Sequence, residues 1–233
     1  MRTILQIRAW GARLAYNRVL AYLATNDDWR ERMFGSFHLS DSREVLIVGP
    51  FSFSSALLFA ARNPNVKFCA IEDGRRLGKY ARLAQQRALT NVRFFGVPKD
   101  APLPFSDGSF DAIICSFAFH ALAPAQKVTM ALDLARVLRM TRRLHVVELT
   151  QPQAGQEGMM LGFAGLVWGA DAVLAHSDGS WIRLLSQSGF EGVKQERSFS
   201  ITVGRLACVS ATKRGRHPKT AASGAKRSRD RSS

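Results

Sequence analysis

The chain has 233 residues, which is enough for one domain with a full hydrophobic core. Its formal net charge is +15 at pH 7, and residues 213–233 alone hold eight Lys or Arg and one acid. The rest of the chain is therefore only moderately basic. Such a balance favours anionic partners, which are nucleic acid, phosphorylated substrates or an acidic lipid surface.

The cysteines and the apolar runs exclude several other classes of protein. Cys69, Cys115 and Cys208 lie in strand-like runs without CxxC spacing, so we expect buried thiols in a reducing compartment and no metal site. No apolar run reaches the ~18 residues that span a bilayer. The start of the chain lacks the apolar region and cleavage site of a secretory signal. These features predict a cytoplasmic protein.

Residues 1–43 are predicted to be helical, with apolar residues at helical spacing and arginines between them. Three interpretations stay open. The segment packs over a ligand cleft, it lies as a basic amphipathic helix on the inner face of a membrane, or it is an organellar transit peptide. The arginines do not gather on one face of a helix, which argues against the transit peptide.

The chain after residue 43 alternates between short apolar runs and helical patterns. The apolar runs predict strands at residues 45–48, 66–72, 92–96, 110–116, 144–148, 193–199 and 206–212. The other patterns predict helices at residues 54–62, 77–89, 124–138 and 180–188. Strands that are apolar on both faces, with helices between them, indicate a parallel sheet covered on both sides. The predicted fold is a doubly wound, Rossmann-like α/β domain.

A nucleotide-binding turn is predicted where the first strand ends at Gly49. Gly49 can adopt backbone angles that other residues resist, and Pro50 and Phe51 then lead into a new helix. The free N–H groups at the start of that helix would face a ligand. We therefore assign Gly49, Pro50 and Phe51 to a cofactor site.

Two acids end the second strand. Glu72 can accept hydrogen bonds from both ribose hydroxyls of a nucleoside bound over the Gly49 turn, and Asp73 is a second candidate for this role. The alternative is an exposed acid without a ligand. The third strand is followed by Val97 and Pro98, in a loop that we expect to contact a nucleobase through backbone and apolar atoms.

Six stretches together carry a family resemblance: VLIVG, FCAIE, NVRFFG, LPFSDGSFDAIICSFAFHAL, ARVLRMTRRLHVVE and LLSQSGFEGVKQ. Across residues 44–212 the chain resembles the class I S-adenosylmethionine (SAM) methyltransferases, and especially the ubiquinone- and menaquinone-biosynthesis type. The most specific pieces are PFSDGSFD, and ARVLR followed by LHVVE. The resemblance implies a seven-stranded sheet with an antiparallel last strand, and SAM as the methyl donor.

The resemblance also implies roles for single residues. Gly49 would lie under the methionine part of SAM, Glu72 would bind the ribose hydroxyls, and Val97 would contact the adenine. Ser116 and Phe117 would line the cleft beyond the fourth strand.

Three features depart from the family pattern. Two glycines of the family loop are Phe51 and Phe53 here, and the acid that holds the adenine amino group is Val97. The Pro-Gly-Gly turn before the fifth strand is Met140-Thr141-Arg142, which we expect to remain a loop. Two hypotheses follow. The chain is a SAM-dependent methyltransferase, or it is a non-catalytic binding or scaffold protein that has kept the fold and lost SAM binding.

His120 is the candidate general base, because its family position lies near the mouth of the cleft. A packed histidine is the alternative, and Glu148 either faces the same cleft or has a structural role. The apolar insertion at residues 150–179 occupies the acceptor-lid position of the family. It suits a small, apolar or lipid-like acceptor, or it simply closes the core.

Residues 213–233 are basic and almost without apolar side chains, which predicts a disordered tail. The tail attracts phosphates without specificity or only keeps the protein soluble. An RNA-directed enzyme would also need a basic groove beside the cleft. The expected organisation is a helical cap at residues 1–43, a methyltransferase-like domain at residues 44–212, and this tail.

Overall fold

The structure is a computed structural model. It describes residues 11–16, 18, 19, 22, 35, 37, 39, 41–98, 101–153, 155–201 and 204–215. Most of the predicted helical cap and nearly all of the predicted tail lie outside the described residues, so the expectations for them stay predictions. Within the cap, residues 11–16 are helical.

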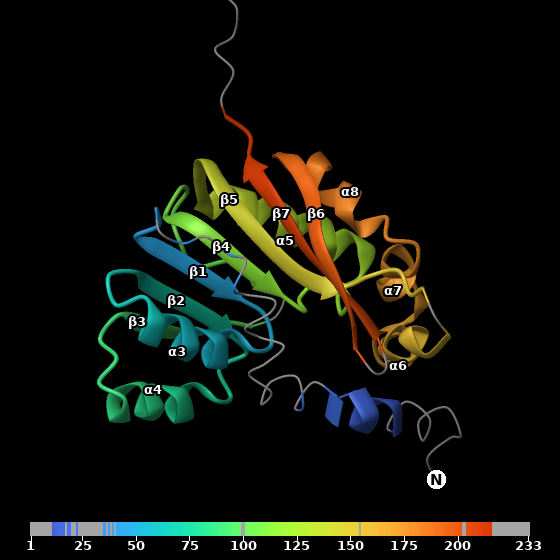
Figure 1. Cartoon of the computed structure of the whole chain (residues 1–233), viewed down its shortest axis with the longest axis horizontal. Coiled ribbons are helices and arrows are strands. Elements are labelled where there is room, and N and C mark those ends of the chain that lie inside the picture. The colour runs from blue at the N-terminus through green and yellow to red at the C-terminus, as the bar shows by residue number, and fades with distance from the viewer. Residues whose placement is uncertain are drawn as a thin grey trace, which may run out of the picture.

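Seven strands form one sheet in the order β3-β2-β1-β4-β5-β7-β6 (Figure 1). β1 to β5 pair in parallel, whereas β7 is antiparallel to both β5 and β6. This arrangement confirms the predicted doubly wound sheet with an antiparallel last strand. The strands are β1 (Glu44–Val48), β2 (Lys67–Glu72), β3 (Val92–Gly96), β4 (Phe110–Ser116), β5 (Leu138–Leu149), β6 (Phe190–Ile201) and β7 (Gly204–Lys213).

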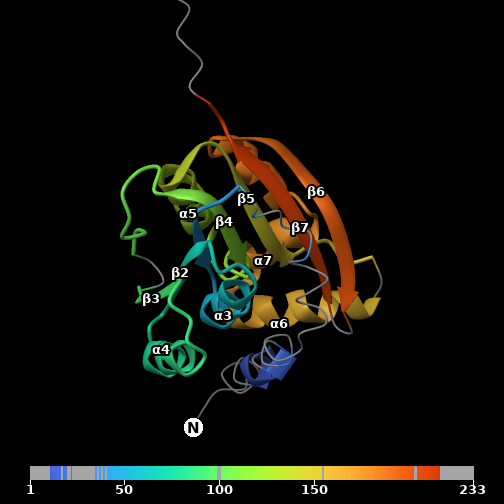
Figure 2. The same cartoon turned by 60° about the vertical axis from the view of Figure 1, so that its left-hand side comes forward.

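Helices cover both faces of the sheet (Figures 1 and 2). One core packs under α3 and α6 and the other under α5 and α8. α6 and α7 follow β5 at the carboxyl edge of the sheet, in the predicted lid segment. The helices are α3 (Ser52–Arg62), α4 (Leu77–Gln86), α5 (Pro124–Val137), α6 (Gly158–Trp168), α7 (Ala170–Ser177) and α8 (Trp181–Gln187), with a 3₁₀ turn, η1, at Gly155–Glu157.

The central strands are apolar because they are buried on both faces. β4 is buried along its whole length. Alternate side chains of each strand enter opposite cores: Ile47 and Ile114 enter the core under α3, while Leu46 and Ile113 enter the core under α5. Four neighbouring carboxyl ends, those of β2, β1, β4 and β5, therefore reach the same edge of the sheet.

β5 begins earlier than predicted. We expected a loop at Met140, Thr141 and Arg142, but β5 starts at Leu138, directly after α5. The pairing with β4 shifts register there, and Thr141 has a φ of +60°. The extra residues form a bulge within the strand. The position at which we expected a loop is therefore an irregular stretch of β5.

A helical boundary also differs from the prediction. α4 ends at Gln86 rather than at residue 89, because Ala88 adopts a left-handed φ of +52° that a helix cannot contain. The predicted lid segment, residues 150–179, contains two helices separated by Gly169, whose φ is +96°.

Candidate functional site

The predicted nucleotide turn lies where the strand order reverses, between β1 and β4. Gly49 follows β1 with a φ of +122°, and a Cβ at this position would lie 1.9 Å from the Ser116 carbonyl oxygen. Only glycine fits so close to the neighbouring backbone. Ligands of open α/β sheets bind outside the strand ends at such a switch point, and the predicted turn lies at this place.

Glu72 ends β2 beside this turn, and its side chain is 4% exposed. Oε1 accepts the backbone N–H of Phe53 at 3.0 Å, and Oε2 accepts the Arg76 guanidinium at 2.9 Å. The same Arg76 nitrogen donates to the Pro50 carbonyl at 2.9 Å. Burial raises the pKa of Glu72 to about 7, although Arg76 opposes the shift. The predicted ribose-binding carboxylate thus has two protein donors as partners.

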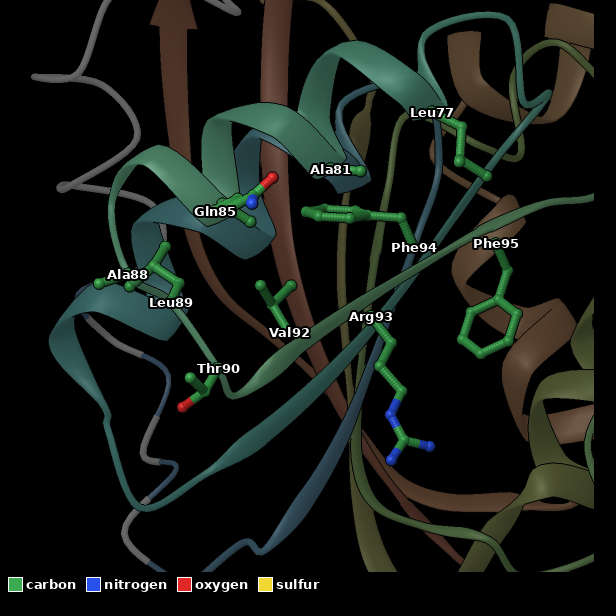
Figure 3. Close-up of a pocket in the computed structure, with 11 residues that line it drawn as sticks. Leu77, Ala81, Gln85, Ala88, Leu89, Thr90, Val92, Arg93, Phe94 and Phe95 are labelled. Atoms are coloured by element: carbon green, nitrogen blue, oxygen red, sulfur yellow. The ribbon is translucent and has the colours of Figure 1, made fainter.

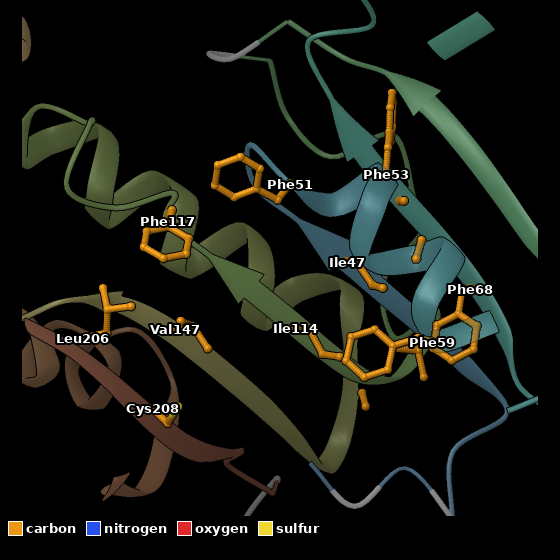
Figure 4. Close-up of a cluster of buried hydrophobic side chains, with 14 of the residues drawn as sticks. Ile47, Phe51, Phe53, Phe59, Phe68, Ile114, Phe117, Val147, Leu206 and Cys208 are labelled. Atoms are coloured by element: carbon orange, nitrogen blue, oxygen red, sulfur yellow. The ribbon is translucent and has the colours of Figure 1, made fainter. Parts of the chain in front are cut away.

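The two phenylalanines that replace family glycines have different surroundings (Figure 4). Phe53 is fully buried, and its ring packs edge-on against Tyr80 and Phe94. Phe51 is also buried, and its ring lies edge-on to Phe117 with 5.8 Å between centroids. Both rings belong to the core beneath α3, but Phe51 is the one that lies against Phe117, near the ends of β1 and β4.

The other predicted cofactor residues contribute less. The Asp73 carboxylate pairs with the exposed Arg75. Val97 follows β3, and its N–H donates to the Glu72 carbonyl at 2.8 Å, so its backbone extends the sheet pairing. Pro98 is exposed. The described part of this loop presents backbone and apolar atoms, and its contact with a nucleobase stays a prediction.

Ser116 and Phe117 lie at the end of β4, against the Gly49 turn. Ser116 Oγ is buried without a hydrogen-bond partner among the described residues. Phe117 has a φ of +55°, a left-handed conformation that costs an aromatic residue on the order of 1–3 kcal/mol. An orphaned buried hydroxyl beside a strained residue is typical of a ligand site.

These residues fit SAM once two side chains, Arg76 and Phe51, move. Gly49, Glu72 and Ser116 supply the turn, the carboxylate and the free hydroxyl of a cofactor cradle. Arg76 covers Glu72, but its side chain is 46% exposed and can turn into solvent. A nucleoside whose hydroxyls take over its hydrogen bond to the buried carboxylate can therefore replace Arg76. Phe51 is the remaining obstacle.

His120 lies at the other side of the switch point, completely buried, in a chain of three hydrogen-bonded side chains. Its Nδ1 donates to Glu148 Oε1 at 2.5 Å, and its Nε2 accepts the hydroxyl of Tyr16. The backbone N–H groups of Phe119 and Leu149 also donate to the Glu148 carboxylate, each at 2.8 Å. Burial alone would raise the pKa of Glu148, but His120 outweighs it and holds the pKa well below its usual range.

A second buried histidine adjoins this chain. The ring of His176, on α7, lies 6.2 Å from that of His120 and stacks on Trp181. His176 Nδ1 donates to the Leu149 carbonyl at 2.9 Å, and burial lowers its pKa to about 4. Lys127 Nζ bonds to a carbonyl of the same helix, and burial lowers its pKa to about 8. These groups make the acceptor side of the site an enclosed polar cluster.

The sequence analysis identified His120 and Glu148 but missed Tyr16, Arg76 and His176. Tyr16 is 104 positions from His120, so no local pattern joins them. The pairing of Arg76 with Glu72 could have been predicted, because Arg76 stands four residues after Glu72 at the start of a helix. His176 lies in the apolar lid, and a single histidine among apolar residues could have identified it as a candidate site residue.

Two hollows that the described residues line lie away from the switch point. The larger, about 640 Å³, lies between α4 and β3 and is lined mainly by apolar side chains, including Leu77, Leu89 and Phe94 (Figure 3). The other, about 250 Å³, lies beside Arg143 and Arg197. Among the described residues there is no group of three or more His, Cys, Asp or Glu side chains that could hold a metal ion. No helix in this part of the chain is long and apolar enough to cross a bilayer.

Comparison with known proteins supports the family resemblance that the sequence indicated. A family model described as "Methyltransferase domain" matches residues 54–144. An uncharacterized methyltransferase, YcgJ of Bacillus subtilis (strain 168), is 32% identical over 111 residues, which cover 47% of this chain and 42% of YcgJ. A demethylmenaquinone methyltransferase from Thermus thermophilus is 28% identical over 144 residues, covering 62% of this chain and 64% of that protein. The chain thus spans less than two thirds of either relative.

Solved structures share the fold. PigF with SAH, the demethylated form of SAM, matches with a TM-score of 0.60 and 16% identity, over 78% of this chain and 53% of PigF. The shared fold and the family model over residues 54–144 bear out the predicted resemblance to the class I methyltransferases.

Proposed function

We propose that this protein is a SAM-dependent methyltransferase for a small, apolar acceptor that carries an ionisable hydroxyl. The observation that carries the proposal is the buried pair of His120 and Glu148, placed at the ends of β4 and β5 beside the Gly49 turn. A base at this position is needed when the acceptor must lose a proton.

Each residue has a defined task under this proposal. Gly49, Glu72 and Ser116 hold the cofactor, which supplies an activated methyl group when bound. His120 accepts the proton of the acceptor hydroxyl at Nε2. Glu148 accepts the hydrogen bond from Nδ1, which fixes the ring orientation and stabilises the charged imidazolium. Burial keeps bulk water away from this proton transfer.

The lid supports an apolar or lipid-like acceptor. Met159, Leu166 and Leu174 on α6 and α7 expose 45%, 56% and 65% of their surface, and Leu14 and Tyr22 are exposed in the N-terminal segment. Exposed apolar side chains gathered in a functional segment are typical of contact with an apolar partner. We propose a cytoplasmic protein that touches the inner face of a membrane through this segment and that does not bind nucleic acid specifically.

Calorimetry with SAM and SAH on the purified chain tests the proposal. We expect micromolar binding of wild type and a loss of at least tenfold in Glu72→Gln, because one charged hydrogen-bond acceptor is worth about 1.5–3 kcal/mol. Glu44→Gln, at a partly exposed acid paired with Lys67, is the matched control and should bind as wild type does. Absence of binding at millimolar SAM contradicts the proposal.

A second candidate function is a non-catalytic binding or scaffold protein. Two contacts favour it: the ring of Phe51 against Phe117, and Arg76 on the carboxylate of Glu72. Both place protein atoms at the cofactor side of the site. This candidate predicts no binding of SAM or SAH, and no rise in melting temperature with either ligand.

A further inference from the structure

The side chain of Tyr16 occupies the acceptor side of the site. It is 2% exposed, although it belongs to a short helical segment at the surface. Its ring packs edge-on against Trp168 of α6, with 4.6 Å between centroids, and lies 5.7 Å from the ring of His120. Figure 2 shows this segment lying beside α6. A phenol thus sits in an aromatic cage directly over the candidate base.

The hydrogen bond of Tyr16 has the direction that an acceptor needs. In the neutral tautomer of His120, in which Nδ1 donates to Glu148, Nε2 keeps its lone pair and accepts the Tyr16 hydroxyl proton. Burial, with Glu148 nearby, raises the pKa of Tyr16 well above its usual value, so the hydroxyl stays protonated. Both nitrogens of His120 are therefore occupied, and an acceptor reaches the base only by replacing Tyr16.

The segment that carries Tyr16 contacts the domain through side chains along one edge of its helix. Within residues 11–16, only Ala12 and Tyr16 are buried, whereas Gly11, Arg13 and Leu14 are exposed. These two buried residues are one helical turn apart, so one edge of the helix makes the contact. In the described part of the segment, Ala12, Tyr16 and the partly buried Val19 make the contact, and a segment docked by one edge opens at a lower free energy than the sheet.

We propose that Tyr16 holds the place of the methyl acceptor, and that the acceptor class is a phenol that displaces Tyr16 from the cage formed by Trp168 and His120. The proposal rests on the proposed function, because it names the substrate class of the same site. A phenol hydroxyl, with a pKa of about 10, is acidic enough for an imidazole base, unlike that of an aliphatic alcohol. The ring, in turn, satisfies the edge-on contact with Trp168.

Binding of p-cresol and toluene tests the proposal. p-Cresol corresponds to the side chain of Tyr, and toluene, which lacks the hydroxyl, corresponds to that of Phe. We use the purified full chain of Tyr16→Ala, with its fold checked by circular dichroism, and titrate both compounds by calorimetry. We expect p-cresol to bind at least about tenfold more tightly, because the buried Nε2 is unpaired without a hydroxyl partner. In Tyr16→Ala/His120→Phe this preference should vanish. Equal affinity for the two compounds in Tyr16→Ala overturns the proposal.

Limited trypsin digestion of wild type tests displacement in the intact chain, even if Tyr16→Ala does not fold. Cleavage after Arg13 or Arg18 requires the segment to open. We expect p-cresol to accelerate this cleavage several-fold, toluene to leave it unchanged, and Tyr16→Phe to be cut faster without a ligand. An unchanged rate with saturating p-cresol means that Tyr16 is a fixed core residue and overturns the proposal.

The two proposals fail separately. Selective p-cresol binding without SAM binding supports phenol recognition and rejects methyl transfer. SAM binding without selectivity for p-cresol leaves the methyltransferase standing and rejects the inference about Tyr16.

Discussion

The two halves of the site are built differently. On the cofactor side, the Glu72 carboxylate is held partly by Arg76, whose side chain is 46% exposed and weakly held. On the acceptor side, the side chains of His120 and Glu148 are both fully buried, and two backbone N–H groups also bond the carboxylate. The first half can exchange a protein partner for a ligand, whereas the second holds its geometry. A site of this kind keeps its base oriented while its cofactor side opens.

The largest expected effect is the loss of Glu148. Glu148→Ala leaves the backbone N–H groups of Phe119 and Leu149 and the ring of His120 without their acceptor, so we expect a loss of about 3–5 kcal/mol in the free energy of unfolding. Urea denaturation measures it. Glu191→Ala, an exposed acid 3.9 Å from Arg214, is the control and should change stability by less than about 1 kcal/mol. A small effect of Glu148→Ala would mean that the acceptor side is not rigid.

The two halves should also respond to pH in opposite directions. His176 has its pKa lowered to about 4, so its unfolded form binds the extra proton, and its contribution to stability is lost as pH falls from about 6.5 towards 4. Glu72 has its pKa raised to about 7, so its folded form binds the extra proton, and its contribution is lost as pH rises from about 4.5 to 7. These two contributions oppose each other over the same range.

Variants separate the two contributions. In Glu72→Gln only His176 remains, and stability should fall by about 2–3 kcal/mol between pH 6.5 and 4.5. In His176→Phe only Glu72 remains, and stability should rise by a similar amount over that interval. Urea unfolding at several pH values measures both slopes. Slopes of the same sign in the two variants would contradict the assignment.

Phe51→Gly restores the glycine of the family loop and acts on the cofactor side of the site alone. Removing the ring frees space beside Phe117, so we expect SAM affinity to rise about ten- to a hundredfold, or roughly 1.4–2.7 kcal/mol. Phe53→Ala is the matched control: it removes a fully buried ring elsewhere, costs about 3–5 kcal/mol of stability, and should not improve SAM binding. No gain in Phe51→Gly favours the non-catalytic candidate. Calorimetry gives the affinities.

The smallest effect is expected from Arg76→Ala. It removes an exposed partner of Glu72, so stability should change by less than about 1 kcal/mol. SAM should bind up to a few-fold more tightly, because the carboxylate no longer exchanges partners. Arg75→Ala, which breaks only the surface pair with Asp73, should leave affinity unchanged. A large loss of SAM affinity in Arg76→Ala would show that Arg76 holds the ligand itself.

The sequence predicted the sheet because its information is local. Apolar runs of four to eight residues, each closed by a turn signal, identified every strand, and the Gly49 turn followed from a strand, a glycine and a helix in succession. Glu72, His120 and Glu148 were identifiable because they stand at or just beyond the carboxyl ends of strands that the topology makes neighbours. Their place in the chain already carried this information.

The contacts that occupy the site were not predictable in this way. Tyr16 meets His120 across 104 positions, and nothing in the pattern of residues 1–43 selects one aromatic side chain for burial. The bulge in β5 depends on register between two strands, which periodicity does not report. Likewise, the different directions of Phe51 and Phe53 depend on how α3 packs, although both replace glycines.

Gly169, between α6 and α7, is a position at which a substitution can alter the acceptor side of the site without affecting the cofactor side. A Cβ at Gly169 would meet no atom within 4 Å, in contrast to Gly49, so an alanine there is opposed only by the positive φ. Such a change alters the preferred backbone angle of a single hinge without a steric clash. The lid could then be stiffened or re-angled by one residue, while the cofactor turn keeps its shape.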